Sequence, residues 1–313
     1  MHANLETAQE RARSRFLITN PHGSPSIESQ LNEASAEAGQ TRASVPRQSS
    51  NTRDNGGRAI PAWEAVERKQ KQEANAWWLV AQSDHAALSG DLAANLSSPF
   101  FPKLDIDVVH AISLHDAGWA QFDGGDEHAN GTRPGEIFWA PKISDQAKPL
   151  SFLEMRPAEF LRAWSNSIAC AKKACAIGGV LVSVHFSRLA ESRLQAGGDT
   201  PDDTRSIRAF VSSQAKRRLS AGANGRSAEE IHLLVDVLQF CDLLSLYLCC
   251  GAQEHVQFPQ TFNGRTIRSL REGEMLRTEP PLFGAGVSLG VRARRYPVSS
   301  DEMNVTTIPF LLA

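Results

Sequence analysis

The sequence is organised around the stretch His115-Asp116-Ala117-Gly118-Trp119. A neutral imidazole beside a carboxylate offers a nitrogen and an oxygen ligand for one divalent metal ion. Val108, Ile112 and His115 stand at positions i, i+4 and i+7, so the spacing predicts a helix that places this histidine on its apolar stripe. Because burial disfavours the charged form of an ionisable side chain, a residue on such a stripe needs a partner. A metal ion is one such partner.

Ligand-type residues recur on the apolar faces of three other predicted helices, as His85, His185 and Asp242. Their apolar neighbours at helical spacing are Leu88, Leu92 and Leu96 for His85, Leu181 and Leu189 for His185, and Val235, Leu238 and Leu246 for Asp242. A single inward histidine is more often a hydrogen-bonded core residue than a ligand, and Asp116 could merely orient His115. Several ligand-type residues with the same facing instead favour a metal site inside a helical bundle.

Local signals set the expected ends of these helices. Asp84 is the expected N-cap of the helix that carries His85. Ser227-Ala228-Glu229-Glu230 is a capping box that opens the long helix around Asp242. Other helices are expected over residues 157–176 and 180–194, and a polar helix or helix pair over residues 199–221. Gly178-Gly179 is expected to break the helical pattern between the first two.

The C-terminal part of the chain carries signals for strands. Asn263-Gly264 predicts a β-hairpin, and alternation of apolar and polar residues over 287–294 predicts a strand. Trp77-Trp78-Leu79-Val80 is aromatic and β-branched, which predicts a strand that pairs with this segment. We therefore expect a small antiparallel appendage whose arginines could bind an anion or protect an edge strand. These arginines are Arg265, Arg268, Arg271, Arg292, Arg294 and Arg295.

Two segments carry no sustained apolar periodicity. Residues 1–60 are rich in small and polar residues, and this composition predicts a disordered tail, with a peptide-binding role left open. Residues 121–149 are rich in glycine and proline, which indicates either a lid over the site or a solvated loop. The remaining residues, 61–313, are expected to form one mainly α domain that includes the β appendage.

Composition argues against several classes of partner. A net charge of −2 gives no global basic field that would attract nucleic acid or an anionic membrane. We expect no apolar run long enough to span a bilayer. The five cysteines form no C-x-x-C pair, which indicates a reducing, cytoplasmic setting. The sequence leaves the oligomeric state open.

The order His … His-Asp … Asp on successive helices resembles that of the HD-domain superfamily of metal-dependent phosphohydrolases. The resemblance implies an HD-domain-like helical bundle in which His85, His115, Asp116 and Asp242 bind one divalent metal ion. His185 resembles the additional histidine with which two-metal members of that superfamily bind a second ion.

The chain is more closely similar to the DUF3891 family. The segments that carry this similarity are Gln82-Ser83-Asp84-His85-Ala86, His115-Asp116-Ala117-Gly118-Trp119, Val182-Ser183-Val184-His185 and Asp242-Leu243-Leu244-Ser245-Leu246. The resemblance covers roughly Trp77 to Pro297, about the length of one large domain. The family implies no function beyond its HD-like pattern, and the long N-terminal tail departs from its usual short start.

The leading hypothesis is a metal-dependent hydrolase that acts on a phosphoester, with nucleotides among the candidate substrates. The expected ligands of a divalent ion such as Mn²⁺, Mg²⁺ or Fe²⁺ are His85, His115, Asp116, His185 and Asp242. Two alternatives stay open. One is a di-iron oxygenase of HD fold that uses His185, and the other is a non-catalytic, metal-stabilised helical domain whose tail binds a partner.

The same hypothesis assigns roles in catalysis. Asp116, Asp123 and His185 are the expected catalytic residues, with Asp123 or His185 acting as a base or as a ligand of a second ion. Lys142 or Arg188 could neutralise the charge of a small phosphorylated substrate.

Overall fold

The computed structural model describes residues 51–53, 59–61, 77–121, 155–221, 225–251, 255–272, 275–296 and 305–313. Its helices are α4 (Gln82–Ala94), α5 (Ile106–Ser113), the 3-10 helix η2 (Ala117–Gln121), α6 (Pro157–Ala174), α7 (Ala176–Ala196), α8 (Pro201–Ala221) and α9 (Ala228–Cys249). The strands of its main sheet are β3 (Trp77–Leu79), β4 (Val256–Phe262), β5 (Arg265–Glu272), β6 (Met275–Glu279), β7 (Val287–Tyr296) and β8 (Val305–Leu312).

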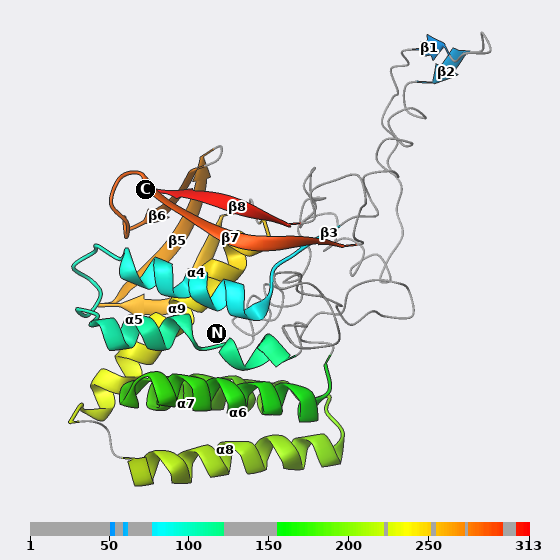
Figure 1. The fold of residues 1–313 in the computed structure, drawn as a ribbon. Coiled ribbons are helices and arrows are strands. Elements are labelled where there is room, and N and C mark those ends of the chain that lie inside the picture. The colour runs from blue at the N-terminus through cyan, green and yellow to red at the C-terminus, as the bar shows by residue number, and fades with distance from the viewer. Residues whose placement is uncertain are drawn as a thin grey trace, which may run out of the picture.

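These elements stack in layers, with the sheet at one end and α8 at the other (Figure 1). The helix α4 contacts β7 of the sheet, and it also contacts α5, η2 and α9. The helix α7 contacts α5, α6, α8 and α9. The segments that carry the expected metal ligands therefore meet in the middle of the helical layers.

The helix α9 forms the core of the molecule. Every residue from Val237 to Cys249 is buried. Length and composition alone would let α9 cross a membrane, so the expectation that the chain has no such apolar run was wrong. However, 83% of its apolar window is buried inside the protein, as is typical of a core helix. The predicted cap is confirmed, because the Ser227 side chain accepts a hydrogen bond from the Glu230 backbone N–H.

The sheet is larger than the predicted appendage, so the fold is α+β and the mainly α prediction was wrong. Six strands pair in the order β3-β7-β8-β6-β5-β4. The sheet is mixed, since β6 and β8 run parallel, and it curls into a half-barrel (Figure 1). Proline hides two of these strands from pattern analysis, because it removes a ladder donor and weakens a strand signal. Pro259 lies in β4 and Pro309 lies in β8.

Two of the strand predictions are confirmed. Trp77 pairs with Tyr296, so the tryptophan strand does add to the C-terminal segment, as the edge strand β3 beside β7. Asn263 and Gly264 join β4 to β5 with positive φ angles of 50° and 71°, as a two-residue hairpin of type I′ requires. Within the predicted tail, the short strands β1 (Asn51–Arg53) and β2 (Ala59–Pro61) pair with each other. The rest of residues 1–60 lies outside the described part of the chain.

Two local predictions for the helices were wrong. The helix α4 begins at Gln82 without a side-chain cap, and Asp84 instead faces the sheet, where its carboxylate lies 3.4 Å from the Arg294 guanidinium. The glycine pair does not break a helix, because α6 ends earlier and both glycines lie within α7. A Cβ on Gly178 would lie 2.7 Å from the carbonyl oxygen of Ala171, so glycine here allows α7 to pack closely on α6.

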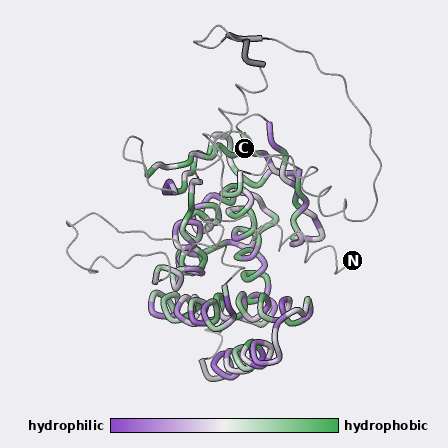
Figure 2. The backbone as a smooth tube through the Cα atoms, turned by 90° about the vertical axis from the view of Figure 1, so that its right-hand side faces the viewer, coloured by the Kyte–Doolittle hydropathy of each residue, from purple (hydrophilic) through white to green (hydrophobic). Residues whose placement is uncertain are grey.

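The outermost helix, α8, confirms the prediction of a polar helix over residues 199–221. Figure 2 shows hydrophilic and hydrophobic residues interspersed along this helix at the bottom of the molecule. Arg218 anchors it by donating to the hydroxyls of Ser183 (2.9 Å) and Ser187 (2.8 Å) on α7. These bonds hold α8 against the helix that carries His185.

Candidate metal centre

The structure brings together all five residues that the sequence predicts as metal ligands. His85 comes from α4, His115 and Asp116 from the turn between α5 and η2, His185 from α7 and Asp242 from α9. All five are buried, with exposed fractions between 0% and 7%. They form two overlapping trios, His85–His115–Asp116 and His115–His185–Asp242, in which the potential ligand atoms lie within 4.8 Å of one another.

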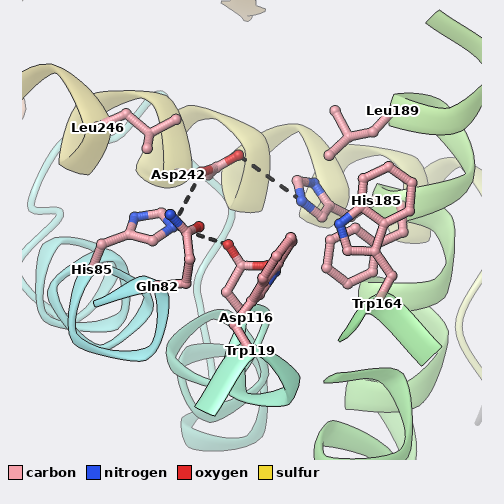
Figure 3. Close-up of a pocket in the computed structure, with 10 residues that line it drawn as sticks. Gln82, His85, Asp116, Trp119, Trp164, His185, Leu189, Asp242 and Leu246 are labelled. Atoms are coloured by element: carbon pink, nitrogen blue, oxygen red, sulfur yellow. Dashed lines mark hydrogen bonds and ion pairs between the residues drawn. The ribbon is translucent and has the colours of Figure 1, made fainter. Parts of the chain in front are cut away.

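The distances between these side chains leave a gap of the size of a metal ion. The Nε2 atom of His85 lies 3.1 Å from Asp116 Oδ2 and 3.8 Å from Asp242 Oδ1. The Nε2 atom of His115 lies 3.6 Å from each of the same two oxygens. The Nε2 atom of His185 lies 3.9 Å from Asp242 Oδ2 (Figure 3). Ligands bound about 2.1 Å from one ion stand about 3.0 to 3.4 Å apart, so a small inward adjustment would complete a coordination shell.

In two of the imidazoles, a hydrogen bond of Nδ1, the ring nitrogen that faces away from the gap, sets the tautomer. His115 Nδ1 lies 2.8 Å from the carbonyl oxygen of Ile112, which can only accept, so Nδ1 carries the proton. His85 Nδ1 lies 2.7 Å from the hydroxyl oxygen of Ser245, whose own proton is donated to the carbonyl oxygen of Asp242. When Nε2 of either ring carries no proton, its lone pair therefore points toward the gap, as a metal ligand requires.

The central motif supports its own aspartate. The indole Nε1 of Trp119 donates to Asp116 Oδ1 over 3.1 Å, which leaves Oδ2 facing the histidines. Gly118 lies against α6, and its backbone N–H donates to the hydroxyl of Ser167 over 2.9 Å. A Cβ on Gly118 would lie 2.1 Å from the carbonyl oxygen of Ala163, so only glycine fits this contact. The motif thus supplies two ligands, one supporting donor and one close helix contact.

Charges in the site favour a cation. Burial disfavours the charged form of His115, but the carboxylates of Asp116 and Asp242 outweigh that effect and raise its pKa to about 9. Burial likewise opposes ionisation of Asp116, yet the adjacent His115 and His85 lower the pKa of this carboxyl below its ordinary value. The contacts of His115 Nε2 exceed hydrogen-bond length, and this atom has no hydrogen-bond partner among the described residues. A proton or a metal ion would compensate the two carboxylates.

Four of the five ligands, His85, Asp116, His185 and Asp242, line a small cavity (Figure 3). Its volume is about 20 Å³. A single water needs roughly 10 to 15 Å³ on this scale, so the cavity has room for about one atom of this size next to the ligands. Its lining residues are Gln82, His85, Asp116, Trp119, Trp164, His185, Phe186, Leu189, Asp242 and Leu246.

The other predicted site residues are not part of this cluster. Asp123 and Lys142, together with most of the predicted lid, lie outside the described residues. Arg188 Nη1 instead donates to Asp236 (2.6 Å) and Gln239 (2.8 Å), and its side chain lines a separate surface hollow between α7, α9 and β4. The structure therefore does not place Arg188 where it would neutralise a phosphate bound at the cavity.

Sequence reasoning did not assign roles to three residues that support the site. These are Gln82, Trp119 and Ser245. Each stands three positions from a ligand on the same segment, which is the spacing that places two side chains on one helix face. That spacing is the signal that could have identified them.

Comparison with protein-family models identifies a family. A family model described as "Protein of unknown function (DUF3891)" matches residues 70–311. Searches of curated proteins and of solved structures gave no match. These comparisons do not support membership of the HD-domain superfamily, so the HD-like order of the ligands stands as a resemblance alone.

Proposed function

Because this chain belongs to the DUF3891 family, whose function is unknown, we propose from the site itself that it is a metal-dependent hydrolase of phosphoesters. The observation that carries the proposal is the gathering of three histidines and two aspartates, all buried, in two overlapping trios that could each hold a metal ion. The order of these ligands along the chain also resembles that of the HD phosphohydrolases.

The donor set fits a transition-metal ion better than magnesium. Imidazole nitrogen suits manganese, iron, cobalt, nickel and zinc, whereas Mg²⁺ prefers oxygen ligands and keeps several waters. Two aspartates and three neutral histidines also balance the charge of a divalent ion. When bound, such an ion lowers the pKa of a coordinated water toward about 7 and polarises a phosphoryl oxygen.

The residues of the chain then have separate tasks in this proposal. The ion is held by His85, His115, Asp116, His185 and Asp242. Two of these ligands are oriented by hydrogen bonds, Asp116 through its Oδ1 by Trp119 and His85 through its Nδ1 by Ser245. Because the cavity is small, only a terminal oxygen of the substrate would enter it. We keep Asp123 as the proposed base, a small phosphorylated molecule as the partner, and the cytoplasm as the location.

The alternatives differ in how well the geometry supports them. A di-iron site is disfavoured, because the two trios share His115, whose Nδ1 already donates to Ile112, and the one remaining nitrogen binds one ion. A non-catalytic, metal-stabilised domain has one observation in its favour, which is the nearly complete burial of all five ligands. Structural metal sites are closed, whereas catalytic sites keep an open position.

Metal content and phosphatase activity, measured together, test the proposal. We expect about one Mn²⁺, Fe²⁺ or Co²⁺ per chain and metal-dependent release of phosphate from nucleotides or other phosphoesters. Asp116→Ala should abolish both, whereas the matched change Asp202→Ala on the exposed face of α8 should alter neither. Stoichiometric metal without any hydrolysis would favour the non-catalytic alternative, and absence of bound metal would refute both.

A further inference from the structure

A glutamine that is not among the five ligands points into the same cavity. Gln82 is 4% exposed and lines the cavity with His85, Asp116 and Asp242. It precedes His85 by three residues on α4, so both side chains extend from one face of that helix. Figure 3 shows its carboxamide among these three side chains.

The amide nitrogen of Gln82 is a buried donor without an acceptor. Gln82 Nε2 has no hydrogen-bond partner in the described part of the chain, although two carboxylates line the same cavity. A buried polar group that lacks a partner is costly, and such groups in native proteins usually mark a bound water, an ion or a functional role. A bound metal would engage the carboxylate oxygens, which leaves the Gln82 N–H groups available for an acceptor that is not part of the protein.

We propose that Gln82 is a positioning residue whose amide donates a hydrogen bond to an anionic oxygen, such as a phosphoryl oxygen, seated in the cavity beside the metal ion. This inference rests on the proposed function, because it assumes that the five ligands hold an ion. Three features support it, namely the direction of the side chain, its burial and the small cavity. A cavity of about 20 Å³ admits about one atom of water size, so an oxygen seated there must lie close to the carboxamide.

A glutamine suits this task on chemical grounds. Its amide is neutral at every working pH and donates two hydrogen bonds, so it holds an oxygen anion without adding charge to a balanced site. A lysine or arginine would compete with the ion electrostatically, and a carboxylate would repel the substrate oxygen. Hydrogen bonds to charged groups are worth about 1.5 to 3 kcal/mol, equivalent to about ten- to hundredfold in affinity.

The test uses full-length protein loaded with Co²⁺, with inorganic phosphate as the probe. Gln82→Met keeps the length and burial of the side chain but removes the donor. Gln214→Met is the matched control, because Gln214 is also buried but bonds Ser183 away from the cavity. Cobalt affinity is measured by competition with a chelator, and phosphate affinity by the change in the visible spectrum of the bound Co²⁺.

We expect Gln82→Met to keep its Co²⁺ affinity within about threefold while its phosphate affinity falls about ten- to hundredfold. Gln214→Met should match the wild type in both. A second variant, Gln82→Glu, should bind Co²⁺ more tightly and phosphate more weakly, because it adds a carboxylate to the cavity.

Two results would overturn this inference alone. One is an unchanged phosphate affinity in Gln82→Met, and the other is loss of Co²⁺ from that variant, which would make Gln82 a ligand or a packing residue. Failure of the wild-type protein to bind Co²⁺ would instead overturn the proposed function, and this inference with it. Co²⁺ binding by the wild-type protein therefore separates failure of the proposed function from failure of the role proposed for Gln82.

Discussion

At the scale of single residues, the candidate centre consists of ligands and of neighbours that fix their orientation. Asp116 receives the indole N–H of Trp119, and His85 donates to Ser245. Such partners set the tautomer of a ligand histidine and the direction of a ligand carboxylate, so they control metal affinity without touching the metal. They also explain why these polar residues are buried next to apolar helices.

The first prediction concerns Ser245. Ser245→Ala removes the acceptor of the His85 Nδ1 proton and leaves a buried donor unsatisfied, so metal affinity should fall about 10- to 100-fold. Chelator competition with Mn²⁺ or Co²⁺ measures this change. The control is Ser89→Ala, since Ser89 is equally buried, and its hydroxyl bonds Ser245 and the backbone carbonyl oxygen of His85 rather than the imidazole. Equal metal affinities in the two variants would contradict the assigned role.

The second prediction concerns pH. In the metal-free protein His115 keeps its proton up to its raised pKa of about 9, and this proton must leave before Nε2 binds an ion. Metal affinity should therefore increase about tenfold per pH unit between roughly pH 6.5 and 9 and then level off. The lowered pKa of Asp116 keeps this carboxylate ionised throughout that range. Metal titrations at several pH values measure the slope, and a flat profile would contradict the coupling.

Three ligands, His85, His185 and Asp242, could be predicted from sequence because each is an ionisable residue on the apolar stripe of a helix, whereas His115 and Asp116 lie in the turn after α5 and were predicted from the His-Asp pair. Asp242, for example, lies in a helix whose residues from Val237 to Cys249 are all buried. The supporting residues could not be predicted in the same way. Glutamine and serine are uncharged, so their burial raises no obvious conflict in a sequence, and their role depends on contacts across helices such as that of Ser245 with His85.

At the scale of elements, the position of η2 against α6 fixes the central motif. Gly118 brings the two backbones into direct contact, with its N–H on Ser167. The turn that carries His115 and Asp116 is thereby held between α5 and α6, which share contacts with α7. Close backbone contact at this glycine thus determines where two of the ligands lie.

The third prediction concerns this contact. Gly118→Ala would place a Cβ 2.1 Å from the Ala163 carbonyl oxygen, and backbone atoms must move to relieve the clash. We expect the free energy of unfolding to fall by about 1 to 3 kcal/mol and metal binding to become weaker. Urea unfolding with and without metal measures both effects. Gly284→Ala is the control, because no atom lies within 4 Å of the Cβ it would add.

Elements differ in how well the sequence predicts them. Helices such as α9 follow from periodicity and from a capping residue, and the hairpin at Asn263-Gly264 follows from turn chemistry. The extent of the sheet did not follow, because the parallel pairing of β6 with β8 joins segments separated by β7 and leaves no local signal. Side-chain spacing also cannot distinguish a glycine that ends a helix from one that, like Gly178, permits close packing.

At the scale of the whole molecule, one binding event would connect the main helical elements. The ligands come from α4, the turn before η2, α7 and α9, and α4 also contacts the sheet through β7. Asp84 adds to this connection through its ion pair with Arg294. A bound ion would therefore add to the packing and the hydrogen bonds that already join these elements, such as that of His85 with Ser245, and it would compensate two buried carboxylates at the centre of the fold.

The fourth prediction is that metal stabilises the folded protein. A ligand that binds only the folded state at 100 times its Kd adds about 2.7 kcal/mol to the free energy of unfolding. For a domain of about 150 to 250 residues, each kcal/mol raises Tm by about 2 to 4 °C, so we expect an increase of about 5 to 10 °C. Thermal unfolding with excess Mn²⁺ or Co²⁺ and with a chelator measures this difference. Asp116→Ala should unfold at the same temperature in both conditions, because it lacks a central ligand. An equal shift in that variant would show that the metal acts elsewhere, and no shift in the wild-type protein would show that these buried side chains hold the fold together without an ion.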